Sequence, residues 1–142
     1  MSTEQNKATI RRWFDEAWNN GNFASAGEMY STNYILHDPS GPVHSPEGLK
    51  QLITAYRTGF PDLHVIIEDM VAEEDKVASR FIVRGTHKGE LMGIPPTGKQ
   101  VTLSSILISR FADGKWAEDW ANYDALGMMQ QLGVIPAPGQ AS

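Results

Sequence analysis

Apolar residues near the N-terminus recur with helical spacing. They fall at i, i+3, i+4, i+7 and i+8, which places them on one face of an α-helix. They are Ile10, Trp13, Phe14, Ala17 and Trp18. Ser2 and Gln5 have the spacing of a capping box, and Asn19-Asn20-Gly21 predicts the end of the helix. The aromatic stripe is typical either of plain core or of the wall of an apolar pocket.

A second long helix is predicted from Ser45 to residue 59. Ser45 suits the N-cap and Pro46 the first helical position. Its apolar face consists of Leu49, Leu52, Ile53 and Tyr56. Between the two helices we expect a short helix over 23–30, a brief strand over 34–37 and a loop over 38–42.

From residue 63 onward the pattern is that of strands. Runs at 63–72 and 77–86 are followed by two arms around Asp113-Gly114, a strong hairpin signal. Asp124 and Gly133 suit the two ends of a last helix. Helices followed by antiparallel strands predict an α+β fold. We expect one domain over 1–135 and a flexible tail over 136–142.

A curved, mostly antiparallel sheet that carries the N-terminal helices over its concave face would form a cone. Its apolar interior would suit a small hydrophobic or aromatic molecule. In the second hairpin arm, strict alternation puts Asp119 on one face with small neighbours and puts Trp116, Glu118 and Trp120 on the other. A carboxyl group with room around it could meet a ligand, whereas on an exposed face it would simply contact solvent.

Charge and composition exclude several classes of function. The 142 residues include 12 Lys plus Arg and 17 Asp plus Glu, giving a formal net charge of −5. Without a basic run, nucleic acid and anionic membrane surfaces are not expected partners. The absence of Cys excludes thiolate catalysis and Cys-ligated zinc. We find no membrane-spanning or signal-type segment and expect a cytoplasmic protein.

Motifs for a serine nucleophile, a P-loop or a dinucleotide are absent, which leaves general acid–base chemistry in an apolar pocket. Asp119 is the candidate base, because burial would raise its pKa toward neutrality. Arg80 would either stabilise an enolate oxygen or form a surface ion pair. His64 is either a pocket residue or a structural histidine.

The four histidines have no helical metal-ligand spacing. His37-Asp38 with His44 is a weak candidate for a metal cluster, and we expect no metal.

Seven short motifs carry a resemblance to a known family. They are His37-Asp38-Pro39, Phe60-Pro61-Asp62-Leu63-His64, Arg84-Gly85-Thr86-His87-Lys88-Gly89, Gly93-Ile94-Pro95-Pro96-Thr97-Gly98-Lys99, Arg110-Phe111-Ala112-Asp113-Gly114-Lys115, Glu118-Asp119-Trp120 and Gln130-Gln131-Leu132-Gly133. In this order, and over nearly the whole chain, they resemble the SnoaL-like polyketide cyclases of the ester cyclase type. The resemblance implies the cone-shaped α+β barrel of the nuclear-transport-factor-2-like superfamily.

The resemblance implies ring closure of an aromatic polyketide ester by intramolecular aldol condensation, without a metal or an organic cofactor. It matches Asp119 to the acid/base aspartate of the family. Many members carry a histidine in the preceding strand where this chain has Leu107. His64 or His37 would then supply the second polar group.

Three hypotheses remain open. The first is a cyclase with Asp119 and His64 as catalytic residues. Its substrate-binding residues would be Trp13, Phe14, Trp18, Tyr34, His37 and Arg80. The second is a non-catalytic binding protein, or another acid/base enzyme of the superfamily such as an epoxide hydrolase or an isomerase. The third, compatible with both, is a homodimer or higher homo-oligomer that uses Trp116 and Trp120 on the outer sheet face.

Overall fold

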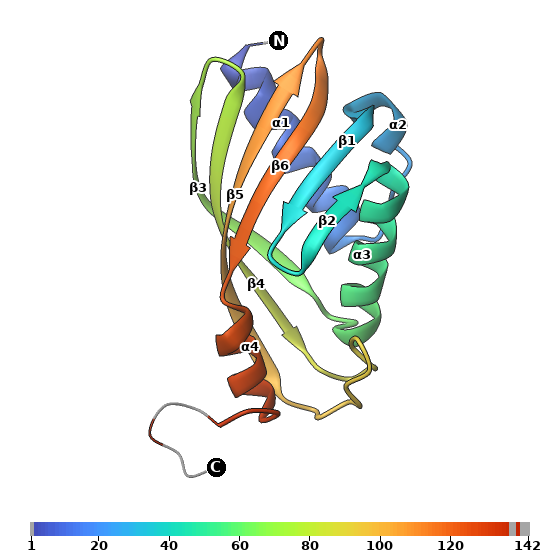
Figure 1. The fold of residues 1–142 in the computed structure, drawn as a ribbon, viewed down its shortest axis with the longest axis vertical. Coiled ribbons are helices and arrows are strands. Elements are labelled where there is room, and N and C mark those ends of the chain that lie inside the picture. The colour runs from blue at the N-terminus through green and yellow to red at the C-terminus, as the bar shows by residue number, and fades with distance from the viewer. Residues whose placement is uncertain (1, 137–138, 140–142) are drawn as a thin grey trace.

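A curved sheet with helices on one side makes up the computed structural model, which describes residues 2–136 and residue 139 (Figure 1). The elements in chain order are α1 (Thr3–Trp13), η1 (Phe14–Asn19), α2 (Ala26–Met29), β1 (Tyr30–Asp38), β2 (Gly41–His44), α3 (Ser45–Gly59), β3 (His64–Glu73), β4 (Lys76–Thr86), β5 (Gln100–Ala112), β6 (Lys115–Tyr123) and α4 (Ala125–Leu132).

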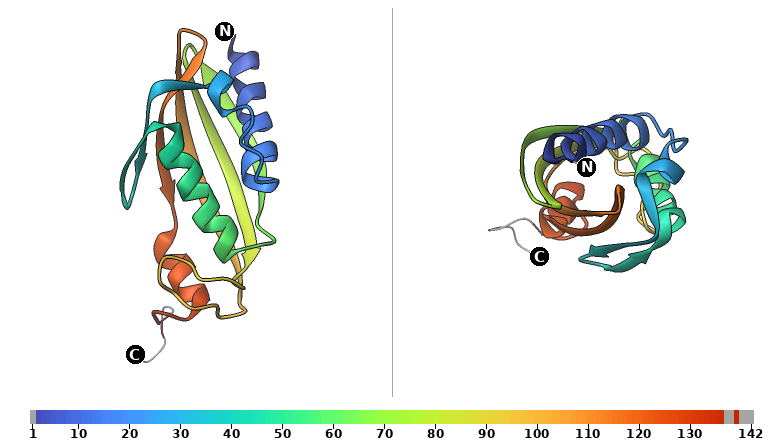
Figure 2. Two further views of the ribbon diagram at one scale, coloured as in Figure 1. Left: turned by 90° about the vertical axis from the view of Figure 1, so that its right-hand side faces the viewer. Right: turned by 90° about the horizontal axis from the view of Figure 1, so that it is seen from above.

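The six strands form one sheet in the order β2-β1-β6-β5-β4-β3. Only β1 and β6 pair in parallel, and all other neighbours are antiparallel. The sheet curls without closing, and α1 and α3 lie over its concave side (Figure 2). The predicted α+β fold with a curved, mostly antiparallel sheet is therefore confirmed. No helix within the described ranges is long and apolar enough to cross a membrane.

The predicted capping signals are present at both ends of the chain. Ser2 and Gln5 form the capping box of α1. The Asp124 side chain accepts from the N–H of Gly127 at the start of α4, and Gly133 ends that helix with a left-handed φ of 80°. These local signals fix where the helices begin and end, and the buried apolar stripe fixes how α1 lies on the sheet.

The first helix ends in a wider turn. After Trp13 the chain continues as the π-helical segment η1, a form that is rare outside short insertions in α-helices. The Asn19 side chain then bonds both backbone groups of Val65, accepting from its N–H at 2.6 Å and donating to its carbonyl at 3.2 Å. This contact fastens the end of the helix to β3.

A β-bulge changes the faces of β6. The hairpin turns at Asp113 and Gly114, both with positive φ as a type I′ turn requires. Trp116 then pairs with Phe111, but Glu118 pairs with Arg110, which leaves Ala117 as an extra residue. The bulge brings Trp116 to the same side as Asp119, so our assignment of Trp116 to the opposite face is wrong.

The outer face of the sheet differs from our expectation for the same reason. Trp116 is 1% exposed and belongs to the core. Only Trp120 faces outward, where its ring stacks on His37 at 5.5 Å. A subunit contact made by both tryptophans is thereby excluded. The outer face still carries the exposed side chains of Ile106 and Ile108, and a homodimer stays a prediction.

Smaller differences concern the segment 23–44. The short helix covers only Ala26–Met29, and the following strand extends over Tyr30–Asp38. The loop expected over 38–42 is a tight turn, because Gly41–His44 forms β2 and pairs back onto β1. Turn formers dominate this segment, and they concealed a four-residue edge strand. The flexible tail predicted over 136–142 lies outside the described residues, apart from 136 and 139.

The link between Asn19 and Val65 yields a stability prediction. Asn19→Ala is expected to lower the free energy of unfolding by about 2 kcal/mol, because two backbone groups lose their partner. Urea denaturation measures this. Asn33→Ala, at an exposed position on β1, is the control and should stay within about 0.5 kcal/mol of the wild type. Equal effects of the two substitutions would contradict the anchoring role of Asn19.

Candidate active site

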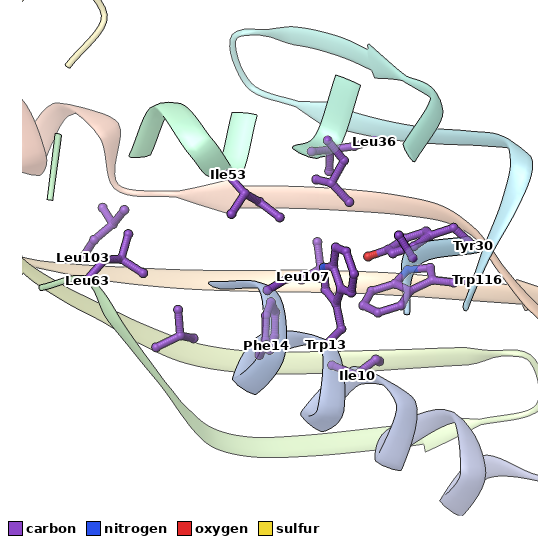
Figure 3. Close-up of a cluster of buried hydrophobic side chains, with 14 of the residues drawn as sticks. Ile10, Trp13, Phe14, Tyr30, Leu36, Ile53, Leu63, Leu103, Leu107 and Trp116 are labelled. Carbon is purple, nitrogen blue, oxygen red and sulfur yellow. The ribbon is translucent and has the colours of Figure 1, made fainter. Parts of the chain in front are cut away.

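A cavity lies between the concave face of the sheet and the helices. We call it the central cavity, and it holds about 720 Å³ of empty space, counting the part that opens to solvent. Figure 3 shows apolar side chains from the helices and the sheet converging there, among them Phe14, Leu63, Leu103 and Leu107. The polar groups on its wall are few, and they include the carboxyl groups of Asp119 and Asp38.

Asp119 lies in this wall and is only 2% exposed. Its Oδ2 accepts a hydrogen bond from the hydroxyl of Tyr34, and its Oδ1 accepts one of 2.7 Å from the indole N–H of Trp116. Ser109 faces Asp119 across the β5–β6 pair, although its Oγ makes no hydrogen bond of standard geometry within the described part of the chain. The carboxyl group is thus held from both of its oxygens.

The environment shifts the acidity of Asp119 toward neutrality. Burial raises its pKa to about 6, because the charged form loses the stabilisation that water would give. The nearby donors of Ser109, Tyr34 and Trp116 oppose this rise, and the negative charge of Glu118 adds to it. A carboxyl group with a pKa near the working pH can both accept and return a proton, as general acid–base catalysis requires.

Aromatic rings fix the two donors around Asp119. Tyr30 stacks on Trp116 with centroids 4.8 Å apart and meets Tyr34 edge-on at 4.6 Å. Trp13 of α1 packs edge-on against Tyr30, with ring centroids 5.0 Å apart. Burial raises the pKa of Tyr34 well above its usual value, and the neighbouring carboxylate adds to the rise. Its hydroxyl therefore stays protonated and remains a donor.

Part of the predicted site comes together here. The four aromatic residues expected to bind substrate line the central cavity with Asp119; they are Trp13, Phe14, Trp18 and Tyr34. Of the two orientations that the sequence left open for Asp119, the structure has the inward one. Leu107 also faces inward, directly opposite Ala121 in the β5–β6 register. At the position where the resemblance leads us to expect a histidine, the wall is therefore apolar.

Three other predicted residues lie outside the central cavity, which corrects our expectation for them. Arg80 is on the outer face, where its guanidinium group makes two bonds of 3.1 Å to Asp69. His64 is exposed at the start of β3 and borders a separate surface depression. His37 is also on the outer face. Register explains all three placements, because each side chain alternates with a neighbour that points inward.

The surroundings of His37 form a small polar network on the outer face. Its Nε2 lies 2.6 Å from Glu118 Oε2, while Arg110 donates to the other carboxylate oxygen at 3.1 Å. These partners hold the pKa of Glu118 below its usual value, with His37 contributing most. In the described part of the chain, no group of three or more His, Cys, Asp or Glu side chains could hold a metal ion.

Sequence reasoning missed several residues of the central cavity. Asp38, Tyr56, Ser105 and Tyr123 all contribute to its wall. Some signals were present, because Asp38 stands in one of the seven motifs, Tyr56 on the apolar face of α3, and Tyr123 on the same strand face as Asp119. None of these patterns indicates that residues so far apart in the chain meet.

Comparison with known proteins agrees with this architecture. The family described as SnoaL-like polyketide cyclase matches residues 8–132. Aklanonic acid methyl ester cyclase DnrD of Streptomyces peucetius is 29% identical over 127 residues, which cover 83% of this chain and 84% of that protein.

Two solved structures share the fold. AclR of Streptomyces galilaeus, a candidate hydroxylase, superposes with a TM-score of 0.85 at 30% identity, covering 98% of this chain and 87% of its own. IdmH of Streptomyces antibioticus, a candidate polyketide cyclase, superposes with a TM-score of 0.78 at 31% identity, covering 91% and 99%. Because the family match spans most of its length, this chain belongs to the SnoaL-like polyketide cyclase family.

Proposed function

We propose that this protein closes a ring in a polyketide-like ester by an intramolecular aldol-type reaction, with Asp119 as the acid/base. One observation carries the proposal: a carboxyl group with its pKa raised to about 6 lies in the wall of an aromatic-lined cavity. The related cyclase named above for aklanonic acid methyl ester supports the reaction class.

The proposed reaction needs one proton to move out and back. The Asp119 carboxylate takes a proton from a carbon next to a carbonyl group, and the resulting enolate carbon attacks a second carbonyl carbon of the same molecule. A carbon–carbon bond forms as the π bond of that carbonyl breaks, and the new alkoxide takes the proton back from Asp119. No electron or proton is gained or lost overall, so a single carboxyl group can serve both steps.

Tyr34 is proposed to replace the missing histidine as the second polar group. Its hydroxyl bonds directly to Asp119 and stays protonated, so it can orient the carboxylate and stabilise its charged form. Trp116 holds the other oxygen through its indole N–H. This assignment takes the place of our earlier expectation that His64 or His37 fills that role.

The aromatic wall is proposed to hold a flat substrate against the sheet. Trp13 and Phe14 approach from the helical side, and Trp18 packs near Tyr56 with centroids 6.1 Å apart. Ala121 and Leu107 leave an apolar floor without hydrogen-bonding groups beside Asp119. Such a site binds by apolar contact and directs the reacting carbon with few polar groups.

A non-catalytic binding protein is the weaker alternative. Burying a carboxyl group costs stability, and a ligand-binding wall would gain nothing from a group tuned near neutral pH. Recovery of every tested ligand unchanged after long incubation would favour that alternative.

The first prediction concerns turnover. Asp119→Asn is expected to lower kcat by at least about 100-fold, because an amide cannot take the proton. The fold should persist, since the Asn oxygen can accept from Trp116 while its amino group donates to the Tyr34 oxygen. Aklanonic and nogalonic acid methyl esters, the compounds for which relatives are named, are the substrates to assay by chromatography.

A matched variant tests whether His64 is catalytic together with Asp119, as we expected from the sequence. His64→Gln should keep wild-type turnover, because the imidazole lies on the outer face. Loss of activity in His64→Gln, or full activity in Asp119→Asn, would refute the assignment.

The second prediction concerns pH. A general base must be ionised, so kcat/KM should rise about tenfold per pH unit below pH 6 and level off above it. The pKa that governs this profile is that of Asp119, raised to about 6 by burial. Initial rates between pH 4.5 and pH 8 measure the profile. A profile that is flat through pH 6 would contradict a base with this pKa.

The third prediction concerns stability. The folded pKa of Asp119 lies above its model-compound value, about 6 against 3.8, so the folded state binds this proton more tightly. Ionisation therefore favours unfolding, and wild-type stability falls as pH rises from about 4 to about 6. The difference is about 3 kcal/mol.

Asp119→Asn has no such group. Its stability relative to the wild type should rise by about 2.5 kcal/mol between pH 4 and pH 7, most of the full difference, as measured by urea denaturation at both values. If the stability difference between Asp119→Asn and the wild type is independent of pH, the folded protein does not shift the pKa of Asp119.

The fourth prediction concerns assembly. We expect a homodimer that uses the outer sheet face, where Ile106 and Ile108 are exposed. Ile108→Glu should shift the protein to a monomer in sedimentation velocity at micromolar concentration. A wild-type protein that sediments as a monomer under these conditions would rule this out.

A further inference from the structure

A second polar cluster lies in the wall of the central cavity, apart from Asp119. It consists of Asp38 at the end of β1, Tyr56 on α3 and Tyr123 at the end of β6. The Tyr123 hydroxyl donates to Asp38 Oδ2 at 3.1 Å. The same oxygen accepts from the backbone N–H of Ser40 at 3.0 Å and from its hydroxyl at 2.5 Å. The carboxylate is therefore fixed before any ligand enters.

The third member of the cluster adds a hydroxyl group from α3. The Tyr56 hydroxyl lies beside that of Tyr123, and each affects the acidity of the other. Because the Tyr123 hydroxyl donates to Asp38, its oxygen is the atom that can accept from Tyr56. Burial raises the pKa of both tyrosines, so both remain neutral. In a cavity whose wall is mostly apolar, the protonated Tyr56 hydroxyl can turn from Tyr123 to bond an oxygen of a ligand.

The register sets the distance between this cluster and Asp119. Asp119 and Tyr123 lie four residues apart on β6 and both border the cavity. At about 3.3 Å per residue their Cα atoms are roughly 13 Å apart. Ala121, the inward residue between them, has the smallest side chain on this face. The two polar ends are thus joined by a flat apolar stretch, which fits an elongated planar molecule with an oxygen at its far end.

We propose that Asp38, Tyr56 and Tyr123 form a second subsite, which binds an oxygen substituent at the end of the substrate remote from the reacting carbon. The inference rests on the proposed function, because that function defines which end reacts. In this subsite the Tyr56 hydroxyl donates a hydrogen bond to the ligand oxygen. The Tyr123 oxygen accepts a hydrogen bond while its own hydroxyl donates to Asp38, which orients it. It selects substrates by a group that takes no part in bond formation.

Ligand binding tests the subsite without relying on turnover. The probes are 2-hydroxyanthraquinone and 2-methylanthraquinone, which have nearly the same shape and differ in the hydroxyl group. Quenching of tryptophan fluorescence gives Kd, since Trp13 and Trp18 border the cavity. The wild type should prefer the hydroxylated probe by about five- to tenfold, the contribution of one net hydrogen bond.

The variants locate that preference. Tyr56→Phe should abolish it by weakening only the hydroxylated probe, and Tyr123→Phe should reduce it. Asp119→Asn should leave the ratio of the two Kd values unchanged while losing turnover. Thermal unfolding checks that each variant is folded.

Three results with the wild type and the tyrosine variants would overturn the subsite. They are a wild type without the preference, a Tyr56→Phe protein that retains it, or variants in which both probes weaken equally, as a purely structural cluster would produce. Loss of the preference only in Asp119→Asn would place the hydroxyl at the other end of the cavity and also refute the subsite. Because the readout is affinity, a protein that fails to close rings can still pass this test, and an active enzyme can fail it.

Discussion

The burial of one carboxyl group is the constraint on which this site depends. A carboxylate that loses contact with water must be held by donors or become neutral, and Asp119 does some of each. Tyr34 and Trp116 bond its two oxygens, yet desolvation still raises its pKa to about 6. The donors must come from fixed side chains, because a mobile hydroxyl or indole would leave the charge unpaired. The stacked and edge-on rings around Tyr30 provide that rigidity.

Two departures from regular secondary structure assemble this arrangement. The bulge at Ala117 turns Trp116 toward the interior, so that its indole N–H reaches Asp119 only three residues on. The π-helical turn η1 follows directly after Trp13, and its last residue bonds to β3. Irregular segments of both kinds are common near functional sites, where they redirect a side chain that a regular element would point elsewhere.

The features that could be predicted from the sequence are those that depend on neighbouring residues. Periodicity and capping residues gave the helices, the long strands and the hairpin, because these depend on local chemistry. The sequence left open whether Asp119 faces the cavity or solvent, and the structure places it inward. Alternation gave the wrong face for Trp116, because no residue pattern indicates a bulge. The outward positions of His64 and Arg80 depend on the register between β3 and β4, which is a long-range property. The meeting of Asp38, Tyr56 and Tyr123 was equally inaccessible, since it joins three elements across 85 residues of chain.

The burial that gives Asp119 a pKa suited to proton transfer also lowers the stability of the folded protein. A pKa shift of this size costs about 3 kcal/mol at neutral pH, a large share of the stability of an ordinary domain. The carboxyl group lies in the buried aromatic cluster of Trp13, Tyr30 and Trp116. In the second polar cluster, Asp38 lies at a strand end and accepts from the backbone N–H and the hydroxyl of Ser40. At Asp119, a carboxyl group with its pKa raised to about 6 can accept and release a proton near neutral pH. The cavity therefore has one end suited to reaction and another suited to recognition.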